Sequence, residues 1–479
     1  MEDFIAQRKD KVKELTDKHI DPYGHRFART GSLQYYQDNY REGEEISVAG
    51  RIMTYRGHGK TAFCDLHDQT GKLQIYIRQD KIGEQKLREF KLVDIGDILG
   101  VKGTLFKTRT GEITVVVSYF AILSKAIRPL PEKWHGLRDV EMRYRQRYLD
   151  LLSNKKARDL FVQRFKIISA IRIHLDNKGF VEVETPMMQP LPGGAAARPF
   201  ITHHTALDID LYLRIAPELY LKRLLVGGME KIYEINRNFR NEGISRIHNP
   251  EFTMLEVYAA YEDYLYMMDL TEKIISGVAS RVRGGLKVKI SDTVEIDFSP
   301  PWKRLSMLES IKIHTGIDIG RAPETKYREI ASQLGVETSD GIRPAKVIQE
   351  IFDTVVEEKL IQPTFITDYP LELCPLSKAS PDKPGCAERF ELFINGMEIA
   401  NAYSELNDPE EQLRRFRDQI DNDPEGMRRI DEDFIKALEY GMPPAGGLGI
   451  GIDRLVMVLT GAASIREVIL FPQLKPVDE

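Results

Sequence analysis

Five short segments in which apolar and polar residues alternate follow one another between residues 45 and 125. They cover residues 46–52, 62–68, 71–77, 97–103 and 113–119, and glycine-bearing turns separate them. A period of two predicts β-strands, whereas residues 81–91, between the third and fourth strands, have the spacing of a helix. Five strands with an intervening helix are the components of an OB barrel, a fold that frequently binds oligonucleotides.

The rest of the chain mixes helical and strand-like patterns. Residues 160–178 predict a helix that ends at Gly179, and residues 180–186 predict a strand closed by proline. Further strands are expected at 232–240, 253–261, 364–368 and 390–405, with helical segments at about 264–283 and 303–360. Because the regular strand–helix alternation of a parallel sheet is missing, we expect an α+β domain built on an antiparallel sheet.

These patterns divide the 479 residues into four parts. Residues 1–44 are expected to form an amphipathic helix and a lead-in, 45–126 the OB barrel, 127–142 a linker, and 143–479 the α+β domain, with a helical insertion at about 303–360. Domains of roughly 150 residues would allow about three units in a chain of this length.

The distribution of charge changes the expectation for the barrel. The chain as a whole has a net charge of −5, which taken alone argues against a nucleic-acid-binding protein. Residues 46–130, however, contain 14 Lys and Arg against 8 Asp and Glu, while the remaining residues contain 54 against 65. Because the barrel is basic and the rest of the chain acidic, the net charge does not exclude an RNA partner for the barrel.

The cysteines and the hydropathy exclude several classes of protein. Cys64, Cys374 and Cys386 form no CxxC pair, and their odd number argues against a disulfide framework. No spacing of cysteines and histidines suits a zinc site. The charged N-terminus does not have the pattern of a signal peptide, and no apolar run reaches the ~18 residues of a membrane span. We therefore expect a soluble, cytoplasmic protein that does not enter a membrane.

A first candidate site follows the predicted strand at 232–240. Arg240 ends this strand, and a polar loop containing Arg246 and His248 leads to the next strand, at 253–261. A guanidinium held between two strands can bind a phosphate or a carboxylate through two hydrogen bonds. A surface hairpin with solvated charges would have the same composition and is the alternative.

A second candidate site is glycine-rich. Residues 446–454 contain four glycines and end in Arg454, at the start of an apolar, helical run. Glycine permits close approach of the backbone to a ligand. A cation in the first helical turn is unfavourable beside the positive end of the macrodipole, and a bound anion would compensate for it. Since the Walker sequence GxxxxGK[ST] is absent, the segment fits another kind of anion site or a purely structural turn.

A third candidate site is a hairpin around residues 395–396, where Asn-Gly lies between apolar runs. This turn pairs Phe393 with Glu398 and Glu391 with Ala400, so that Glu391 and Glu398 share a face. Their backbones would lie about 7–8 Å apart. A hard cation such as Mg²⁺ can bridge two carboxylates at this separation with water or phosphate oxygens.

The same hairpin continues with Asn401, Tyr403 and Glu405, which in a regular ladder lie on the opposite face. One β-bulge after the turn would bring all three to the side of Glu398 and into a single pocket. An ordinary hairpin with one buried and one solvated face is the alternative.

Together these segments resemble the class II aminoacyl-tRNA synthetases. Residues 236–242 and 249–252 are similar to motif 2, and residues 451–454 to motif 3. The helix ending at Gly179, with the following Glu-Thr-Pro, resembles motif 1, which builds the dimer interface in that class. An OB domain before this core resembles the Asp, Asn and Lys branch. Within this branch, residues 192–200, 216–223 and 398–406 resemble lysyl-tRNA synthetases.

The resemblance implies a fold and an ATP site. The fold would be a five-stranded OB barrel followed by a class II antiparallel-sheet catalytic domain with helical insertions. Arg240 would hold the α-phosphate and the substrate carboxylate, stabilising charge as the carboxylate attacks phosphorus. Arg454 and His248 would contact the γ-phosphate side, with Asn249 nearby.

Further residues of the ATP site follow from the same resemblance. Glu242 would bind the adenine amino group, and Phe252 would lie against the adenine face. Glu391 and Glu398 would hold Mg²⁺, the cofactor, in agreement with the hairpin argument.

The resemblance also implies a pocket for lysine. Its residues would be Gly194, Glu218, Glu256, Tyr258, Glu398, Asn401, Tyr403 and Glu405. Gly194 and Glu218 are expected at the α-amino group, whereas Glu256, Tyr258 and Glu405 surround the ε-ammonium, helped by Asn401. Such an acidic pocket fits lysine, repels aspartate and rejects apolar side chains, which would leave buried charges unpaired.

Arg56, Phe63 and Gln74 match the positions of the barrel that read the anticodon in this branch. An aromatic ring that stacks on a base, beside donors to its edge, suits single-stranded RNA, although an inward Phe63 would simply belong to the core. One position departs from the bacterial pattern. Ile247 stands directly before the loop histidine, where relatives often have arginine, and Arg246 precedes it.

The resemblance implies a homodimer, formed through the motif 1 region, that activates lysine with ATP and transfers it to tRNA(Lys). An aspartyl or asparaginyl enzyme is the nearest alternative, and the acidic pocket disfavours it. An enzyme that lysylates an elongation factor would lack the OB domain. A non-catalytic RNA-binding relative would be free to lose Arg240, Arg454 or Glu391, and all three are present.

Overall fold

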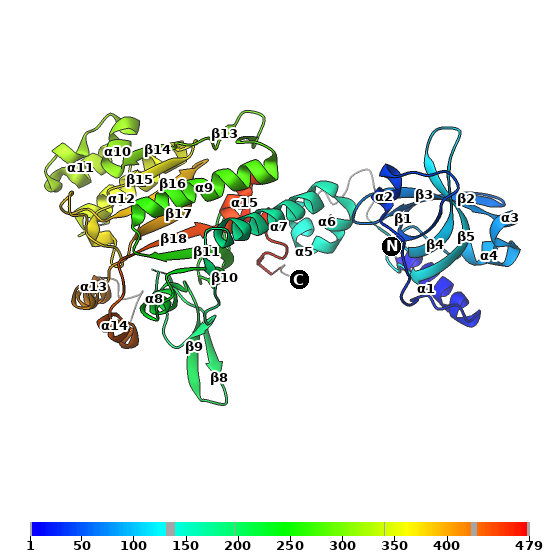
Figure 1. The fold of residues 1–479 in the computed structure, drawn as a ribbon, viewed down its shortest axis with the longest axis horizontal. Coiled ribbons are helices and arrows are strands. Elements are labelled where there is room, and N and C mark those ends of the chain that lie inside the picture. Colours follow the sequence, from blue (N-terminus) through cyan, green and yellow to red (C-terminus); the bar gives the residue numbers. More distant parts are fainter. Residues whose placement is uncertain (1, 131–138, 196, 340, 423–428, 477–479) are drawn as a thin grey trace. The chain divides into compact units, whose positions relative to one another are not determined.

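The structure, a computed structural model, describes residues 2–130, 139–195, 197–339, 341–422 and 429–476. The chain divides into two compact units, residues 1–138 and 139–479 (Figure 1). Of the predicted linker at 127–142, residues 131–138 lie outside the described part of the chain. None of the helices formed by the described residues is both long and apolar enough to cross a membrane.

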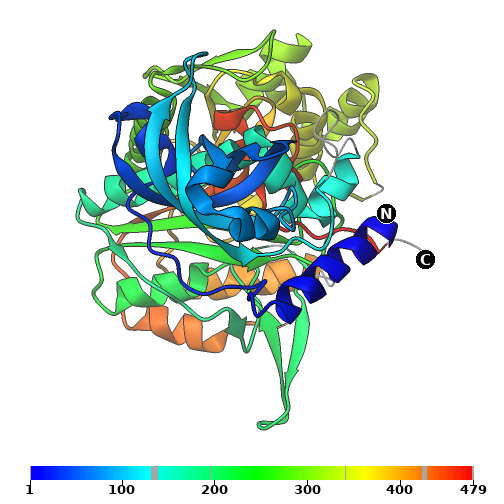
Figure 2. The same cartoon turned by 90° about the vertical axis from the view of Figure 1, so that its right-hand side faces the viewer.

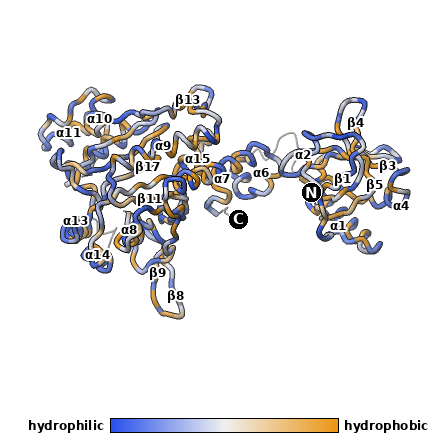
Figure 3. The backbone as a smooth tube through the Cα atoms, in the orientation of Figure 1, coloured by the Kyte–Doolittle hydropathy of each residue, from blue (hydrophilic) through white to orange (hydrophobic). Residues whose placement is uncertain are grey.

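The first unit contains the predicted OB barrel. Its strands are β1 (Glu45–His58), β2 (Thr61–His67), β3 (Lys72–Arg78), β4 (Ile98–Lys107) and β5 (Ile113–Ser124). They close in the order β1-β2-β3-β5-β4, with α3 (Gln79–Ile82) and α4 (Glu84–Phe90) between β3 and β4. Alternate residues such as Leu66 and Ile75 are fully buried inside the barrel. Figure 3 shows this alternation as changing colours along the strands.

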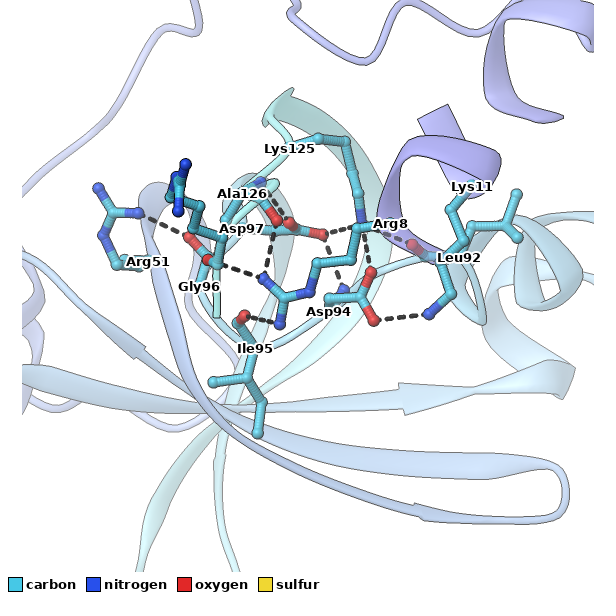
Figure 4. Close-up of polar contacts among 11 residues, drawn as sticks. Arg8, Lys11, Arg51, Leu92, Asp94, Ile95, Gly96, Asp97, Lys125 and Ala126 are labelled. Atoms are coloured by element: carbon cyan, nitrogen blue, oxygen red, sulfur yellow. Dashed lines mark hydrogen bonds and ion pairs between the residues drawn. The ribbon is translucent and has the colours of Figure 1, made fainter. Parts of the chain in front are cut away.

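Two helices precede the barrel, α1 (Glu2–Asp17) and the short α2 (Leu33–Asp38). Helix α1 has one buried residue, Leu15, and is held mainly by polar contacts (Figure 4). Arg8 donates hydrogen bonds to the carbonyl oxygens of Ile95 and Ala126, at 2.9 and 2.8 Å, and Lys11 Nζ lies 2.6 Å from Asp94 Oδ1. The helix is therefore bound to the end of the barrel where β5 leads into the linker.

A buried ion cluster supports this attachment from inside the barrel. The fully buried Lys125 Nζ lies 2.6 Å from Asp97 Oδ2 and 2.7 Å from Asp94 Oδ2, and donates to the Leu92 carbonyl (Figure 4). All three donor positions of the ammonium thus have acceptors, which compensates the cost of removing the charges from water.

The mutation Lys125→Met is expected to destabilise the barrel by about 3 kcal/mol, because it leaves the buried Asp97 carboxylate without its cation. Lys18→Met is the matched control, since Lys18 pairs only with Glu14 at the surface, and its effect should stay within about 0.5 kcal/mol. Hydrogen exchange of the barrel amides in the whole protein measures both changes. Equal protection of the barrel in the two variants would contradict this prediction.

The second unit is built on an eight-stranded sheet with the order β14-β15-β16-β17-β18-β11-β10-β6. The strands are β6 (Val181–Glu182), β10 (Lys231–Phe239), β11 (Glu251–Ala260), β14 (Lys303–Ser306), β15 (Thr364–Thr367), β16 (Arg389–Ile394), β17 (Met397–Ser404) and β18 (Ala445–Gly451). All neighbouring pairs are antiparallel except β14–β15 and β10–β6. The predicted α+β architecture with an antiparallel-rich sheet is therefore confirmed.

Three helices cover one face of this sheet: α7 (Lys155–Asp176), α9 (Tyr264–Arg283) and α15 (Ile452–Thr460) (Figure 1). The core between them contains the alternate strand residues that point to this side, including Leu255, Val257, Leu392 and Ile450. Since successive strand residues point to opposite faces, the residues in between face the other side of the sheet, where the candidate site lies.

Other helices surround this second face. Around the predicted insertion they are α10 (Met307–Thr315), α11 (Tyr327–Gln333) and α12 (Pro344–Val355), and near β10 they are α8 (Glu218–Val226), α13 (Pro409–Asn422) and α14 (Glu432–Glu439). A small sheet of β7 (Met188–Gln189), β8 (Ile201–His204) and β9 (Ile209–Leu213) ends in a hairpin that projects from the unit in both views (Figures 1 and 2). The remaining elements are α5 (Val140–Arg145), α6 (Arg147–Ser153), β12 (Lys287–Lys289), β13 (Glu295–Asp297), α16 (Ile465–Val468) and four short 3₁₀ helices.

Two segments differ in kind from the sequence-based expectation, and the strand expected at 180–186 is shorter, at Val181–Glu182. The glycine-rich residues expected to form a turn make strand β18, which lies between β11 and β17 near the centre of the sheet. The segment expected to be helical from about residue 303 opens with strand β14, which pairs in parallel with β15. In both cases the pairing partners are distant in the sequence, so local propensity does not reveal the strand.

Candidate active site

The face of the sheet opposite α7, α9 and α15 is polar. It presents Glu234, Asn236 and Asn238 from β10, Glu256 and Tyr258 from β11, Glu391 from β16, and Asn401 and Tyr403 from β17. Strand β18, at the centre of this face, contributes glycines at alternate positions, such as Gly447 and Gly449. The sheet therefore provides a floor without side chains, bordered by carboxylates, amides and hydroxyls.

The predicted hairpin of β16 and β17 contains the bulge that sequence alone left open. Phe393 pairs with Glu398 as predicted, but the register shifts after this pair, so that Glu391 pairs with Asn401. The predicted pairing of Glu391 with Ala400 is therefore wrong by one residue. Because of the shift, Asn401 and Tyr403 lie on the same face as Glu391, which places acidic and amide side chains in one site.

A cavity of about 450 Å³ lies over this face. Its wall includes all of the predicted ATP-binding and metal-binding residues: Arg240, Glu242, His248, Asn249, Phe252, Glu391, Glu398 and Arg454. These residues come from three strands (β11, β16 and β17), the loop between β10 and β11, and the first turn of α15. The sheet thus brings together residues that are more than 200 positions apart in the sequence.

Arg240 lies just beyond the end of β10, in contact with Phe252 on the neighbouring strand. Its guanidinium carbon is 5.0 Å from the centre of the Phe252 ring, and its backbone N–H donates to the Pro250 carbonyl at 2.8 Å. Burial lowers the pKa of Arg240 from its ordinary value. Its buried Nε has no hydrogen-bond partner among the described residues. A buried guanidinium with an unused donor that faces a cavity is suited to bind an anion.

Arg454 closes the other side of the cavity. Its Nη1 donates to the backbone carbonyl of Glu398 at 2.9 Å and to Glu398 Oε2 at 3.2 Å, and its Nη2 lies 3.1 Å from His248 Nε2. Burial lowers the pKa of His248, and the charge of Arg454 lowers it further. The histidine is therefore neutral at physiological pH, and its ring position is tied to Arg454.

The first turn of α15 is anchored through Asp453. One carboxylate oxygen of Asp453 lies 2.6 Å from Arg164 Nη1 of α7, and the other accepts the backbone N–H of Thr253 at 2.7 Å. Both charged residues are almost fully buried, so the pair positions α15, and with it Arg454, against the strand that carries Phe252.

Glu391 has two fixed partners beside the cavity. Arg389 Nη2 donates to its Oε1 at 2.5 Å, and the Tyr369 hydroxyl donates to its Oε2 at 2.8 Å. Burial raises the pKa of Glu391 to about 7 against the opposing effect of Arg389, and the charge of Glu398 contributes to the rise. The described residues contain no group of three or more His, Cys, Asp and Glu side chains that could hold a metal ion. Two neighbouring carboxylates, one of them buried, fit a hard cation that takes its other ligands from phosphate and water.

A second cavity, of about 950 Å³, adjoins the first. Gly194, Asn401 and Tyr403 line it, and both cavities share Asn401 and Arg389. Arg389 Nε donates to Asn401 Oδ1 at 3.1 Å, so these two side chains form the boundary. Gly194 has a φ of 83°, and a Cβ added there would lie 3.0 Å from Glu218 Cβ, which explains why glycine is suited to this position.

The four other residues predicted to bind lysine form a buried acidic cluster next to Tyr403. Glu218, Glu256, Tyr258 and Glu405 are at most 6% exposed. The Tyr403 hydroxyl donates to Glu218 Oε1 at 2.7 Å, and the Tyr258 hydroxyl donates to Glu256 Oε2 at 3.2 Å. The structure therefore brings the predicted lysine-binding residues together, with Glu398 at the side of the first cavity.

Burial dominates the electrostatics of this cluster. It raises the pKa of Glu256 to about 8, with further contributions from the charges of Glu218 and Glu234. Burial likewise raises the pKa of Glu405, which Lys222 opposes. Carboxylates in such surroundings gain most from a cation, because water is excluded and the Coulomb attraction is weakly screened.

On the barrel, the predicted RNA-binding residues lie on the outer surface. Arg56 and Phe63 are cross-strand partners on β1 and β2, and Gln74 lies on β3. Phe63 is half-buried and stacks on Tyr76, with 4.1 Å between the ring centres and planes 6° apart, so it does not belong to the barrel core. The Gln74 side-chain oxygen accepts the Thr114 hydroxyl at 3.0 Å.

Several residues of these surfaces were missed by the sequence analysis. Tyr76 could have been found, because it is two positions after Gln74 and so shares its face. Arg389 stands in the same relation to Glu391, and Lys222 is one helical turn after Glu218. Tyr369 has no local signal, since only the pairing of distant strands brings it to Glu391.

The loop between β10 and β11 places its hydrophobic residue inward. Ile247 lines the smaller cavity and packs against the core, whereas the exposed Arg246 is not part of the cavity wall. The Arg246 carbonyl accepts the backbone N–H of Ile465 at 2.8 Å. This hydrogen bond anchors the loop so that the side chain of His248, and not that of Arg246, faces Arg454.

Comparison with known proteins agrees with this arrangement. Residues 139–475 match the family described as tRNA synthetases class II (D, K and N), and residues 46–123 match the OB-fold nucleic acid binding domain. The chain is similar to the lysine–tRNA ligase of Pelotomaculum thermopropionicum, with 57% identity covering 99% of this chain and 96% of that protein. It is 55% identical to the lysine–tRNA ligase of Carboxydothermus hydrogenoformans, covering 100% and 99% of the two chains. The lysine–tRNA ligase of Bacillus subtilis is 51% identical, covering 99% and 98%.

Proposed function

Since this chain belongs to the class II tRNA synthetases of the D, K and N type, we propose that it is a lysine–tRNA ligase. The reaction activates lysine with ATP to lysyl-adenylate and transfers the lysyl group to the 3′ end of tRNA(Lys). The buried acidic cluster beside the ATP-sized cavity carries this proposal, because it fits a substrate with a cationic side chain. Such a protein acts where tRNA is charged, which in a cell is the cytoplasm.

ATP binds over the glycine floor of the sheet, between Arg240 and Arg454. Phe252 stacks on the adenine and Glu242 accepts a hydrogen bond from its amino group, while Arg454 and His248 contact the γ-phosphate side, with Asn249 nearby. The guanidinium of Arg240 holds the α-phosphate and the lysine carboxylate. The buried Arg240 Nε supports this arrangement, because this donor has no partner among the described residues and gains one when ATP binds.

The first step needs no general base. The lysine carboxylate is ionised, and its oxygen attacks the α-phosphorus in line with the departing pyrophosphate; a P–O bond forms as the bond to the leaving oxygen breaks. Arg240 stabilises the charge that develops on the α-phosphate, and Arg454 stabilises the pyrophosphate. Most of the rate enhancement therefore comes from orientation and electrostatics.

Glu391 and Glu398 are the residues that would hold Mg²⁺, which when bound neutralises phosphate charge. Glu391 is fixed by Arg389 and Tyr369, so it offers a rigid oxygen rather than a mobile one. The second carboxylate, on Glu398, contacts Arg454, and this links the cation site to the phosphate-binding arginine.

Lysine binding is expected to tighten as the pH rises from about 6 to about 8. Glu256, with a pKa of about 8 in the lysine-free protein, is protonated below that pH, and an ammonium group that binds beside it expels the proton. The KM for lysine should fall by up to about tenfold per pH unit in this range. Glu256→Gln should flatten the profile, and a flat profile in the wild type would contradict the prediction.

The outer face of the barrel is proposed to bind the anticodon through Phe63, Tyr76, Arg56 and Gln74. Tyr76→Ala should weaken tRNA binding by about tenfold, because it removes a stacking surface worth ~1–3 kcal/mol per base. Tyr119→Ala is the control, since Tyr119 is exposed on β5 and pairs with Lys102 instead. Filter binding with tRNA(Lys) measures both, and equal affinities would contradict the assignment.

A homodimer through the motif 1 region is also proposed. Helix α7 and strand β6 expose Val162, Phe165 and Val181, each at 52–53% of its maximal surface. Apolar side chains at this exposure, gathered on the elements that resemble motif 1, suit an interface with a second copy.

Amino-acid-dependent exchange between ATP and pyrophosphate tests the proposed function. We expect exchange with lysine and none with aspartate or asparagine. Exchange with aspartate but not with lysine would show that aspartate, and not lysine, is the substrate. The absence of exchange with every amino acid would favour a non-catalytic RNA-binding protein.

A further inference from the structure

The acidic cluster contains a cation of its own. Lys222, on α8, is fully buried, and its Nζ lies 2.8 Å from Glu218 Oε1 and 2.5 Å from Glu405 Oε2. The ammonium is also 5.7 Å from the centre of the Tyr403 ring. Two carboxylates and an aromatic ring of the predicted lysine pocket therefore surround a lysine of the protein itself.

This contact differs from an ordinary helical ion pair. Glu218 and Lys222 are four residues apart on α8, a spacing that usually gives an exposed pair of little consequence. Here Glu218 is 5% exposed and Lys222 is 0% exposed, and the shorter contact is to Glu405, which follows β17. Lys222 thus connects the helix to the far side of the pocket.

Lys222 uses only part of each carboxylate. Its Nζ forms an ion pair with Oε2 of Glu405, and neither oxygen of this buried carboxylate has a hydrogen-bond partner among the described residues. Glu256, the third carboxylate, has Tyr258 as its partner rather than Lys222. Oxygens therefore remain for the substrate after the internal cation has been accommodated.

The balance of charge then matches lysine. Three carboxylates, Glu218, Glu256 and Glu405, against one internal ammonium leave two negative charges in the ionised pocket. A free lysine has two ammonium groups, which balance these two charges, while its carboxylate is assigned to the Arg240 guanidinium outside this cluster. Without Lys222, three ionised carboxylates would face the two ammonium groups of lysine, and one buried negative charge would have no cation as its partner.

We propose that Lys222 is a specificity-determining and positioning residue of the amino-acid site. It fixes one oxygen each of Glu218 and Glu405 and places a positive charge between the two carboxylates, so that both stay positioned for the ε-ammonium of the substrate. This inference rests on the proposed function, because it takes lysine as the substrate. The groups that face Lys222 and Glu405 are Glu218 on α8, Glu256 and Tyr258 on β11, and Tyr403 on β17.

Selectivity between lysine and norleucine, which ends at the ε-carbon, tests this inference. In Lys222→Met the ratio of kcat/KM for lysine to kcat/KM for norleucine, measured by pyrophosphate exchange, should fall at least tenfold, because Glu218 and Glu405 lose the cation that positions them and that opposes protonation of Glu405. The KM for ATP should change less than twofold. Lys222→Arg, which keeps the charge, should retain more of the ratio than Lys222→Met.

Arg223→Met is the matched control. Arg223 is the next residue of α8, but it pairs with Asp431 and lies over Tyr220, away from the carboxylate cluster. Its removal should leave the selectivity ratio unchanged. Should Lys222→Met not fold, Lys222→Gln takes its place, since it keeps a donor but carries no charge.

A purely structural role would lower kcat/KM for both amino acids equally, and an unchanged ratio in a folded, uncharged variant would overturn the inference. Loss of the ratio in Lys222→Arg to the level of the uncharged variant would also overturn it. Absence of lysine-dependent exchange in the wild type would count instead against the proposed function, so the two failures are distinguishable.

Discussion

Arg240→Gln is expected to reduce lysine-dependent pyrophosphate exchange by about 10²–10³-fold, equivalent to ~3–4 kcal/mol of transition-state stabilisation. Arg240 is the only residue that we assign to both reacting groups, the α-phosphate and the lysine carboxylate. Glutamine keeps donors but loses the charge and the fork geometry that bind two oxygens together. Steady-state exchange with saturating ATP and lysine measures the effect on kcat.

Arg237→Gln is the matched control for this prediction. Arg237 lies on β10, the strand that leads to Arg240, but its side chain is 41% exposed and its Nε is 3.8 Å from Glu251 Oε1 at the surface, outside the cavity wall. Its replacement should change exchange less than twofold. A loss in Arg240→Gln no larger than in Arg237→Gln would show that Arg240 does not contact the reacting groups.

Gly447→Ala is expected to lower kcat/KM for lysine by about 100-fold, or ~3 kcal/mol, the upper range for overpacking in a close-packed site. A Cβ at Gly447 would lie 1.8 Å from Glu405 Oε1 and 2.8 Å from Tyr258 Cε1. These two side chains are expected at the ε-ammonium, and both would have to move. The KM for ATP should rise much less, because the ATP-binding residues are not displaced.

Gly449→Ala, two residues along β18, is the control for the glycine floor. Its added Cβ would come within 3 Å of one atom only, the terminal Cε of Met254, at 2.9 Å. Since a methionine side chain is flexible, we expect less than a tenfold effect on lysine. The prediction for Gly447 would be contradicted by a variant with normal lysine kinetics and a normal melting temperature.

The barrel and the order of the domains could be predicted from the sequence because their signals are local. Alternation along 62–68 and 71–77 reports directly on two faces of a strand, and the structure has the same faces inside and outside. The Asn-Gly turn likewise determined the pairing of Phe393 with Glu398. The bulge beyond it has no signature of its own, so the register after Phe393 could not be derived.

Strand β18 shows why the centre of the site was harder to predict. Its alternate glycines have low strand propensity, yet they occupy the middle of the sheet, where Tyr258, Glu405 and Met254 fill the space that side chains would take. A glycine run that serves as a floor and one that forms a turn have the same composition. The two cases differ only in the residues packed around the glycines, which are distant from them in the chain.

The role of Lys222 lay outside the sequence argument for a related reason. The family resemblance predicts carboxylates around a cationic substrate, whereas a lysine four residues after Glu218 is typical of an exposed helix surface. Its burial and its contact with Glu405 arise where side chains of α8 meet Tyr403 and Glu405, which are far from α8 in the sequence. Such a contact depends on three-dimensional structure rather than on spacing.

Transfer of labelled lysine to tRNA tests the central claim most directly, because it requires the acidic pocket, the ATP site and the barrel in one reaction. With ATP and Mg²⁺, we expect the protein to attach [³H]lysine to tRNA(Lys) transcripts and not to tRNA(Asp), and to attach no labelled aspartate to either. Acid-stable label on tRNA(Asp) with aspartate, or no label on tRNA(Lys) from a protein that is folded and binds ATP, would contradict the account.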